Sequence, residues 1–75
     1  MIYKDHILVV DDDLTLLEQA EQILSDNYLV SLANSGEQAI KYLKSGQEAD
    51  LILLDILMPN MDGYQTLKAI QKLEG

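Results

Sequence analysis

Two short apolar runs, each ending directly in aspartate, constrain the fold of this chain more than any other feature. The first run is His6–Val10, followed by Asp11, and the second is Leu51–Leu54, followed by Asp55. Aliphatic runs of this length are typical of strands that are covered on both faces, as in parallel sheets. Each predicted strand therefore carries a carboxylate at the point where it leaves the interior.

Helical patterns separate and follow these strands. Asp13, Ser35 and Asp62 stand at candidate N-cap positions of three amphipathic helices, and Tyr28–Ala33 is predicted as one more strand. The first helix is expected to bury one apolar stripe, made of Leu16, Leu17, Ala20, Ile23 and Leu24. A strand–helix unit that occurs three times with short connections predicts a parallel sheet, built from right-handed crossovers and covered by helices.

Composition narrows the class of protein. A chain of 75 residues with 48% hydrophobic residues is one domain at most and too apolar to be disordered. A net charge of -8 with only five lysines argues against nucleic acid or an anionic membrane as a partner, and favours cations or basic proteins. The chain has no cysteine for thiolate metal sites, and it shows neither a signal-peptide pattern nor a membrane-spanning run. We expect a cytoplasmic protein.

Three carboxylates are the candidate functional groups. If the first and third strands are neighbours, Asp11, Asp12 and Asp55 meet at one edge of the sheet. Three like charges in one place are unfavourable unless a cation neutralises them, and Mg²⁺ prefers such oxygen ligands. We therefore predict that Asp11 and Asp12 bind Mg²⁺. Asp55, which is already ionised, is the candidate nucleophile for an aspartyl-phosphate reaction.

Simpler interpretations apply to several of the same residues. Acidic residues are favoured in the first turn of a helix, so an acidic run taken alone would be no more than a helix start. Asp13 and Asp62 are predicted as helix caps rather than ligands, and His6 as an ordinary residue at the start of a strand. The spacing of Asp11 and Asp12 from Asp55 is what favours the metal site.

The segments Ile7–Asp13 (ILVVDDD) and Leu51–Gly63 (LILLDILMPNMDG) resemble the receiver domain of two-component response regulators. The resemblance covers the whole chain. It implies that Asp55 accepts phosphate from a histidine kinase, a phosphotransfer protein or a small phosphodonor. It also implies that Asp11 and Asp12, together with Asp55 and the backbone carbonyl of Leu57, form the Mg²⁺ pocket.

The resemblance also implies a flavodoxin-like fold with strand order 2-1-3-4-5, in which the fourth strand ends in Ser or Thr and the fifth in Lys. Residues 1–75 match only the first three strand–helix units. We therefore expect a partial receiver domain: a truncated, three-layer α/β fold with a parallel sheet of order 2-1-3 and helices on both faces. Phosphorylation of Asp55 is expected to be impaired by the missing strands.

In this partial fold Leu51–Leu54 is an edge strand. An apolar edge with unpaired backbone groups is a template for pairing with another strand. We therefore predict a homodimer, which either pairs this strand with its copy across a two-fold axis or exchanges elements with it.

Two other functions are weighed against the receiver module. One is a non-catalytic, dimerising half-fold that no longer transfers phosphate. The other is a phosphatase of the aspartyl-phosphate type, which generally has a second aspartate two residues after the nucleophile, where this chain has Leu57. We do not expect a stand-alone enzyme.

Overall fold

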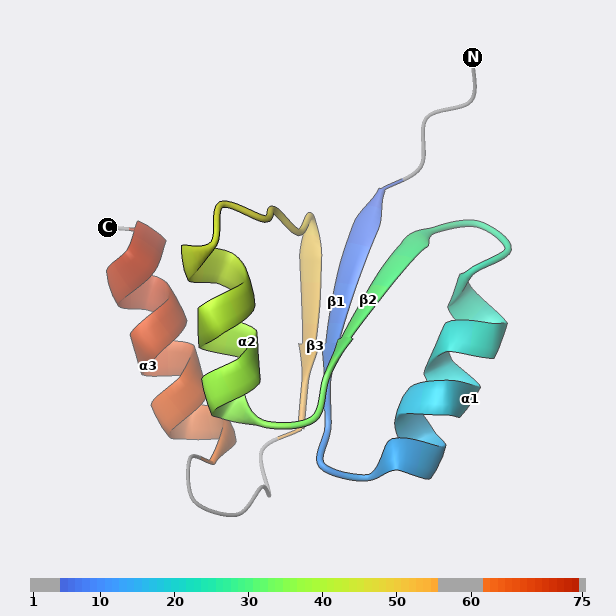
Figure 1. The fold of residues 1–75 in the computed structure, drawn as a ribbon, viewed down its shortest axis with the longest axis horizontal. Coiled ribbons are helices and arrows are strands. Elements are labelled where there is room, and N and C mark those ends of the chain that lie inside the picture. Colours follow the sequence, from blue (N-terminus) through green and yellow to red (C-terminus); the bar gives the residue numbers. More distant parts are fainter. Residues whose placement is uncertain (1–4, 56–61, 75) are drawn as a thin grey trace.

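The computed structural model describes residues 5–55 and 62–74, which form three strands and three helices (Figure 1). In chain order the elements are β1 (His6–Val10), α1 (Leu14–Leu24), β2 (Leu29–Ala33), α2 (Gly36–Lys44), β3 (Leu51–Leu54) and α3 (Gly63–Glu74). Strand β1 lies between β2 and β3 and pairs with both in parallel. The predicted α/β class and the strand order 2-1-3 are confirmed.

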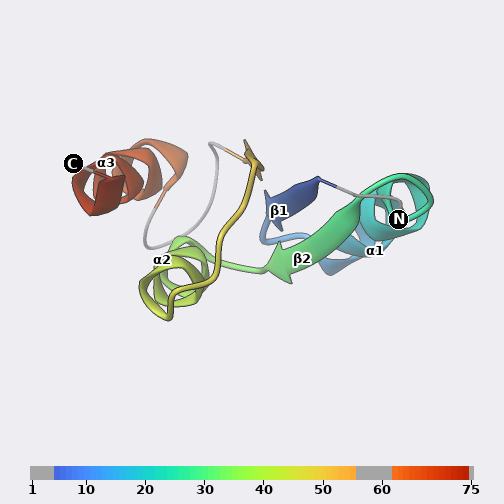
Figure 2. The same cartoon turned by 90° about the horizontal axis from the view of Figure 1, so that it is seen from above.

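Helices lie on both sides of the sheet, and β1 is the most buried strand. Figure 2 shows α1 on one side of the sheet and α2 with α3 on the other. Alternate side chains of β1 serve the two sides: Ile7 and Val9 pack with Leu17 of α1, whereas Leu8 and Val10 pack in the core beneath α2. These four residues of β1 are at most 7% exposed. Its continuous apolar run reflects burial on two faces.

Strand β3 differs from this expectation. The register places Leu51 beside Ile7 and Leu53 beside Val9, on the α1 side of the sheet. Leu51 and Leu53 are nevertheless 52% and 42% exposed, because α1 packs against β1 and β2. The other two side chains of β3 pack in the core beneath α2. Among the described residues, the prediction of two covered faces is right for β1 and wrong for β3.

The buried stripe of α1 is also narrower than predicted. Leu17 is buried, and Ala20 and Leu24 pack partly against the same cluster. Leu16 and Ile23 are 48% and 72% exposed. These two residues are seven positions apart, so they share one angular position on the helix, on the flank of the stripe. A single helix resting on two strands leaves that flank exposed.

The predicted N-caps are confirmed. Asp13 and Asp62 each accept a hydrogen bond from the backbone of the helix that follows, and Ser35 Oγ accepts from the N–H of Gln38 at 3.1 Å. The capping box of α2 differs in one contact. Gln38 Oε1 accepts from the N–H of Asn34 at 2.7 Å, one residue before the position that the box predicts.

His6 forms hydrogen bonds that the sequence does not predict. Its Nε2 atom lies 2.7 Å from Ser31 Oγ and 3.1 Å from the Tyr42 hydroxyl, and the two hydroxyls are 3.1 Å apart. The three residues come from β1, β2 and α2. This triangle ties α2 to two strands at the end of the sheet opposite to Asp11.

No helix in the described parts of the chain is both long and apolar enough to cross a membrane.

Burial predicts a large loss of stability on truncating one aliphatic side chain and little change on truncating another. Leu8→Ala removes a fully buried side chain from the central strand and is expected to cost about 2–5 kcal/mol of unfolding free energy. Ile23→Ala changes a side chain that is 72% exposed and should stay within about 0.5 kcal/mol. Urea denaturation followed by far-UV circular dichroism measures both. Equal losses in the two variants would contradict the assignment of the core.

Candidate metal centre

The pairing of β1 with β3 brings two aspartates side by side. Val10 is paired with Leu54, so the residues that follow, Asp11 and Asp55, leave the sheet at the same edge. The Asp55 N–H donates to the Val10 carbonyl at 2.9 Å, and the Asp11 N–H donates to the Ala33 carbonyl at 3.1 Å. The backbone of both aspartates is therefore held by a neighbouring strand.

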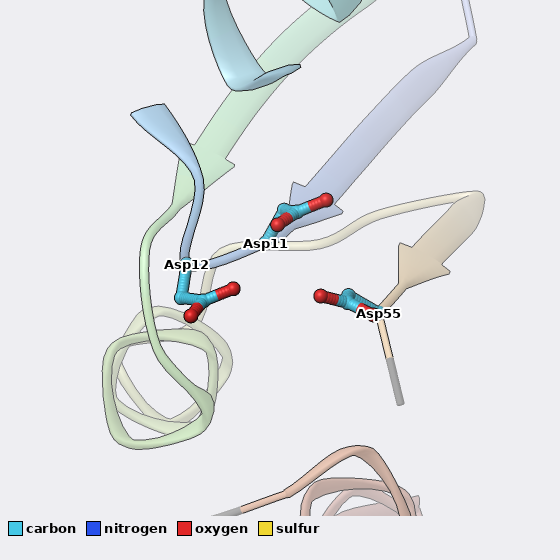
Figure 3. Close-up of side chains that lie close together, drawn as sticks. All are labelled: Asp11, Asp12 and Asp55. Atoms are coloured by element: carbon cyan, nitrogen blue, oxygen red, sulfur yellow. The ribbon is translucent and has the colours of Figure 1, made fainter. Parts of the chain in front are cut away.

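The three acidic side chains converge as the sequence predicts. Asp11, Asp12 and Asp55 each offer one carboxylate oxygen, and these oxygens lie within 4.8 Å of one another (Figure 3). Asp12 is exposed, whereas Asp11 and Asp55 are partly buried. An ion with oxygen ligands at about 2.1 Å spaces those oxygens about 3 to 4 Å apart. A small inward movement of the carboxylates therefore suffices to hold a divalent cation.

Asp13 does not join this cluster. Its Oδ1 atom accepts from the N–H of Thr15 at 2.9 Å and of Leu16 at 3.3 Å, which makes it the N-cap of α1. Its own N–H donates to Asp11 Oδ1 at 3.0 Å. The acidic run is therefore divided between two roles, with Asp11 and Asp12 in the cluster and Asp13 at the helix.

The surroundings of Asp11 disfavour its negative charge. Burial raises the pKa of Asp11 above its ordinary value, and the charges of Asp55, Asp12 and Asp13 raise it further. The hydrogen bond from the Asp13 N–H lowers the pKa of Asp11 without cancelling the other causes. A bound cation would relieve this unfavourable charge, and that is the physical argument for a metal at this position.

The remaining predicted ligand lies in the segment after Asp55. Leu57, with its backbone carbonyl, and the Met58–Pro59 pair lie outside the described residues. The role of Leu57 stays a prediction. The sequence analysis does not predict the hydrogen bond from the Asp13 N–H to Asp11, although an aspartate side chain commonly accepts from the backbone N–H two residues further on.

Open α/β sheets bind their ligands beyond the carboxyl ends of the strands. This chain places carboxylates at the ends of two adjacent parallel strands, so it belongs by architecture to this class of domains. The profile of the response regulator receiver domain matches residues 7–75. The chain is 46% identical over 68 residues to the transcriptional regulatory protein ZraR of Escherichia coli, covering 89% of the chain and 15% of that protein. It is 37% identical over 71 residues to the hybrid signal transduction histidine kinase B of Dictyostelium discoideum, covering 93% of the chain and 4% of that protein.

Solved structures agree with the sequence matches. A CheY-like response regulator receiver domain from Methanospirillum hungatei superposes with a TM-score of 0.87 at 40% identity, over 96% of this chain and 57% of that one. The chain belongs to the response regulator receiver domain family of two-component signalling. It spans a small part of the two curated proteins and little more than half of the solved receiver domain.

The raised pKa of Asp11 predicts how this residue affects stability. A carboxyl group with a raised pKa in the folded state contributes stability below its unfolded pKa and loses it as the pH rises through the folded pKa. At pH 7 the ionised Asp11 therefore destabilises the metal-free protein. Asp11→Asn removes the charge and keeps an oxygen that accepts from the Asp13 N–H.

We expect Asp11→Asn to raise the melting temperature of the metal-free protein at pH 7 by a few degrees, as measured by differential scanning calorimetry. The gain should shrink at about pH 4, where Asp11 is increasingly protonated. Asp26→Asn, the same change at an exposed position after α1, serves as the control and should have little effect. A lower melting temperature for Asp11→Asn would contradict the charge argument.

Proposed function

We propose that the chain is a phosphoacceptor receiver module of a two-component phosphorelay, with Asp55 as the residue that is phosphorylated. The observation that supports this role is the cluster of Asp11, Asp12 and Asp55 at the strand ends, in a chain that belongs to the receiver family. In this proposal Mg²⁺ is held by the three carboxylates and by the backbone carbonyl of Leu57.

The chemistry assigned to Asp55 is nucleophilic attack on phosphorus. One carboxylate oxygen forms a bond to the phosphorus atom of the donor, and the bond from phosphorus to the leaving group breaks, which gives an acyl phosphate on Asp55. No general base is required, because an ionised carboxylate has no proton to lose. When bound, Mg²⁺ neutralises the negative charge of the phosphoryl oxygens.

The donor that we propose is a phosphohistidine on a histidine kinase or phosphotransfer protein. Small phosphodonors such as acetyl phosphate contain the same reactive phosphoryl group. The proposal is in keeping with the names of the relatives, which include a transcriptional regulatory protein and a hybrid histidine kinase.

Acetyl phosphate tests this function. Incubation with acetyl phosphate and Mg²⁺ is expected to add the mass of one phosphoryl group, as seen by intact mass spectrometry. The adduct should disappear in Asp55→Asn and in the presence of EDTA, and it should fall strongly in Asp11→Ala and Asp12→Ala. Asp26→Asn is the matched control and should retain it. The absence of an adduct in the parent chain, or its presence in Asp55→Asn, would refute the proposal.

A second candidate function is a dimerising half-fold. Its support is β3, which lies at the edge of the described sheet (Figure 2). The side chains of Leu51 and Leu53 on this strand are about half exposed. For the 75-residue chain on its own, we propose a homodimer in which β3 pairs with β3 of a second copy. Leu51–Leu54 contains no charge that would oppose this pairing.

The register of the sheet indicates how the copies would pair. The Asp55 N–H bonds to β1, and since bonding alternates along a parallel strand, Ile52 and Leu54 direct their backbone groups to the open edge. A two-fold axis perpendicular to the sheet preserves its faces, so it pairs side chains of the same face. Ile52 can therefore face its own copy on the axis, with Leu51 opposite Leu53, and Asp55 remains outside the paired segment.

Leu53→Lys tests the dimer. The change adds a charge to a half-exposed side chain at the open edge and should convert a dimer into a folded monomer in light scattering at micromolar concentration. Ile23→Lys, at a more exposed position on α1, should remain dimeric. Because each chain has a net charge of -8, added salt should raise the dimer fraction. A folded monomer in the unsubstituted chain would contradict the proposal.

A further inference from the structure

We propose that Asp13 is a positioning residue for the metal centre, which aims the Asp11 carboxylate without binding the ion itself. This inference rests on the Mg²⁺ site of the proposed function. It concerns how the site is prepared for the ion, since Asp13 supplies no ligand.

The first turn of α1 fixes the backbone of Asp13. Its side chain accepts from the N–H groups of Thr15 and Leu16, and its carbonyl accepts from the N–H of Leu17 at 3.1 Å. The residue has extended backbone angles, with φ at -90° and ψ at 107°, as N-cap residues have. These contacts together set the direction in which the Asp13 N–H points.

That N–H points at the metal cluster. It donates to Asp11 Oδ1 at 3.0 Å, while the Asp11 N–H is held by the carbonyl of Ala33. The backbone and the carboxylate of Asp11 are therefore both fixed, and rotation of the side chain is restricted. A carboxylate that is already oriented loses less conformational freedom when it binds an ion, so the ion is bound more tightly.

A direct ligand role for Asp13 is less consistent with the geometry. Its Oδ1 atom already accepts two backbone hydrogen bonds. Within the described residues, the acidic group with converging oxygens consists of Asp11, Asp12 and Asp55. Asp13 therefore acts through Asp11.

Asp62 provides a matched control. It is the N-cap of α3, where Asp62 Oδ1 accepts from the Gln65 N–H at 2.9 Å and Gln65 Oε1 accepts from the Asp62 N–H at 3.1 Å. Asp62→Ala therefore removes a cap of the same kind from a helix that does not hold Asp11. A lower melting temperature should appear in both variants. Weaker Mg²⁺ binding, which would report the loss of positioning, should appear only in the Asp13 variant.

The test is a Mg²⁺ titration of the full chain, followed by amide chemical shifts, with metal-free melting temperatures measured in parallel. We expect Asp13→Ala and Asp62→Ala to lower the melting temperature, and only Asp13→Ala to weaken the Kd for Mg²⁺, by about three- to tenfold. Asp13→Ser and Asp13→Asn, which retain a capping oxygen, should restore the Kd. Asp13→Gly, a milder cap loss, repeats the test if Asp13→Ala does not fold.

Three results would overturn the inference. An unchanged Kd in Asp13→Ala would show that the capping contacts do not position Asp11. Equal weakening in Asp13→Asn and Asp13→Ala would assign the effect to charge, and equal weakening in Asp62→Ala would assign it to stability. If the unsubstituted chain does not bind Mg²⁺, the proposed metal site itself is wrong, and this result is distinct from the other three.

Discussion

The structure depends on the burial of β1 between two parallel neighbours and two layers of helices. Ile7–Val10 are almost fully removed from water, and this apolar contact is the main favourable term available to a chain of this size. The same pairing fixes where Asp11 and Asp55 leave the sheet. Strand β1 therefore supplies the main stabilising contact of the fold and also fixes the positions of the two aspartates.

The site itself works against stability. Burial and neighbouring negative charges raise the pKa of Asp11, so the ionised cluster is unfavourable in the absence of a cation. The hydrogen bond from the Asp13 N–H offsets part of this cost. Charge repulsion of this kind is common where a protein holds ligands ready for an ion, and a cation that binds only the folded state adds to its stability.

Much of this arrangement could be predicted from the sequence, because hydrophobic period, helix caps and strand-end acids are local signals. The strands, the helix starts at Asp13 and Asp62 and the convergence of the acids follow from them. The exposure of Leu53 and Ile23 could not be predicted, since it depends on which strands α1 covers. The His6 network was equally hidden, because Ser31 and Tyr42 come from distant parts of the chain.

The register of β3 against β1 has a consequence for how this chain can vary in length. Successive side chains of a strand point to opposite faces, so one residue inserted into Leu51–Leu54 would reverse the faces of the strand and displace Asp55 from Asp11 at once. Core and site would be lost in a single step. The connection between α2 and β3, where Gly46 adopts a φ of 92°, can instead change in length without shifting this register.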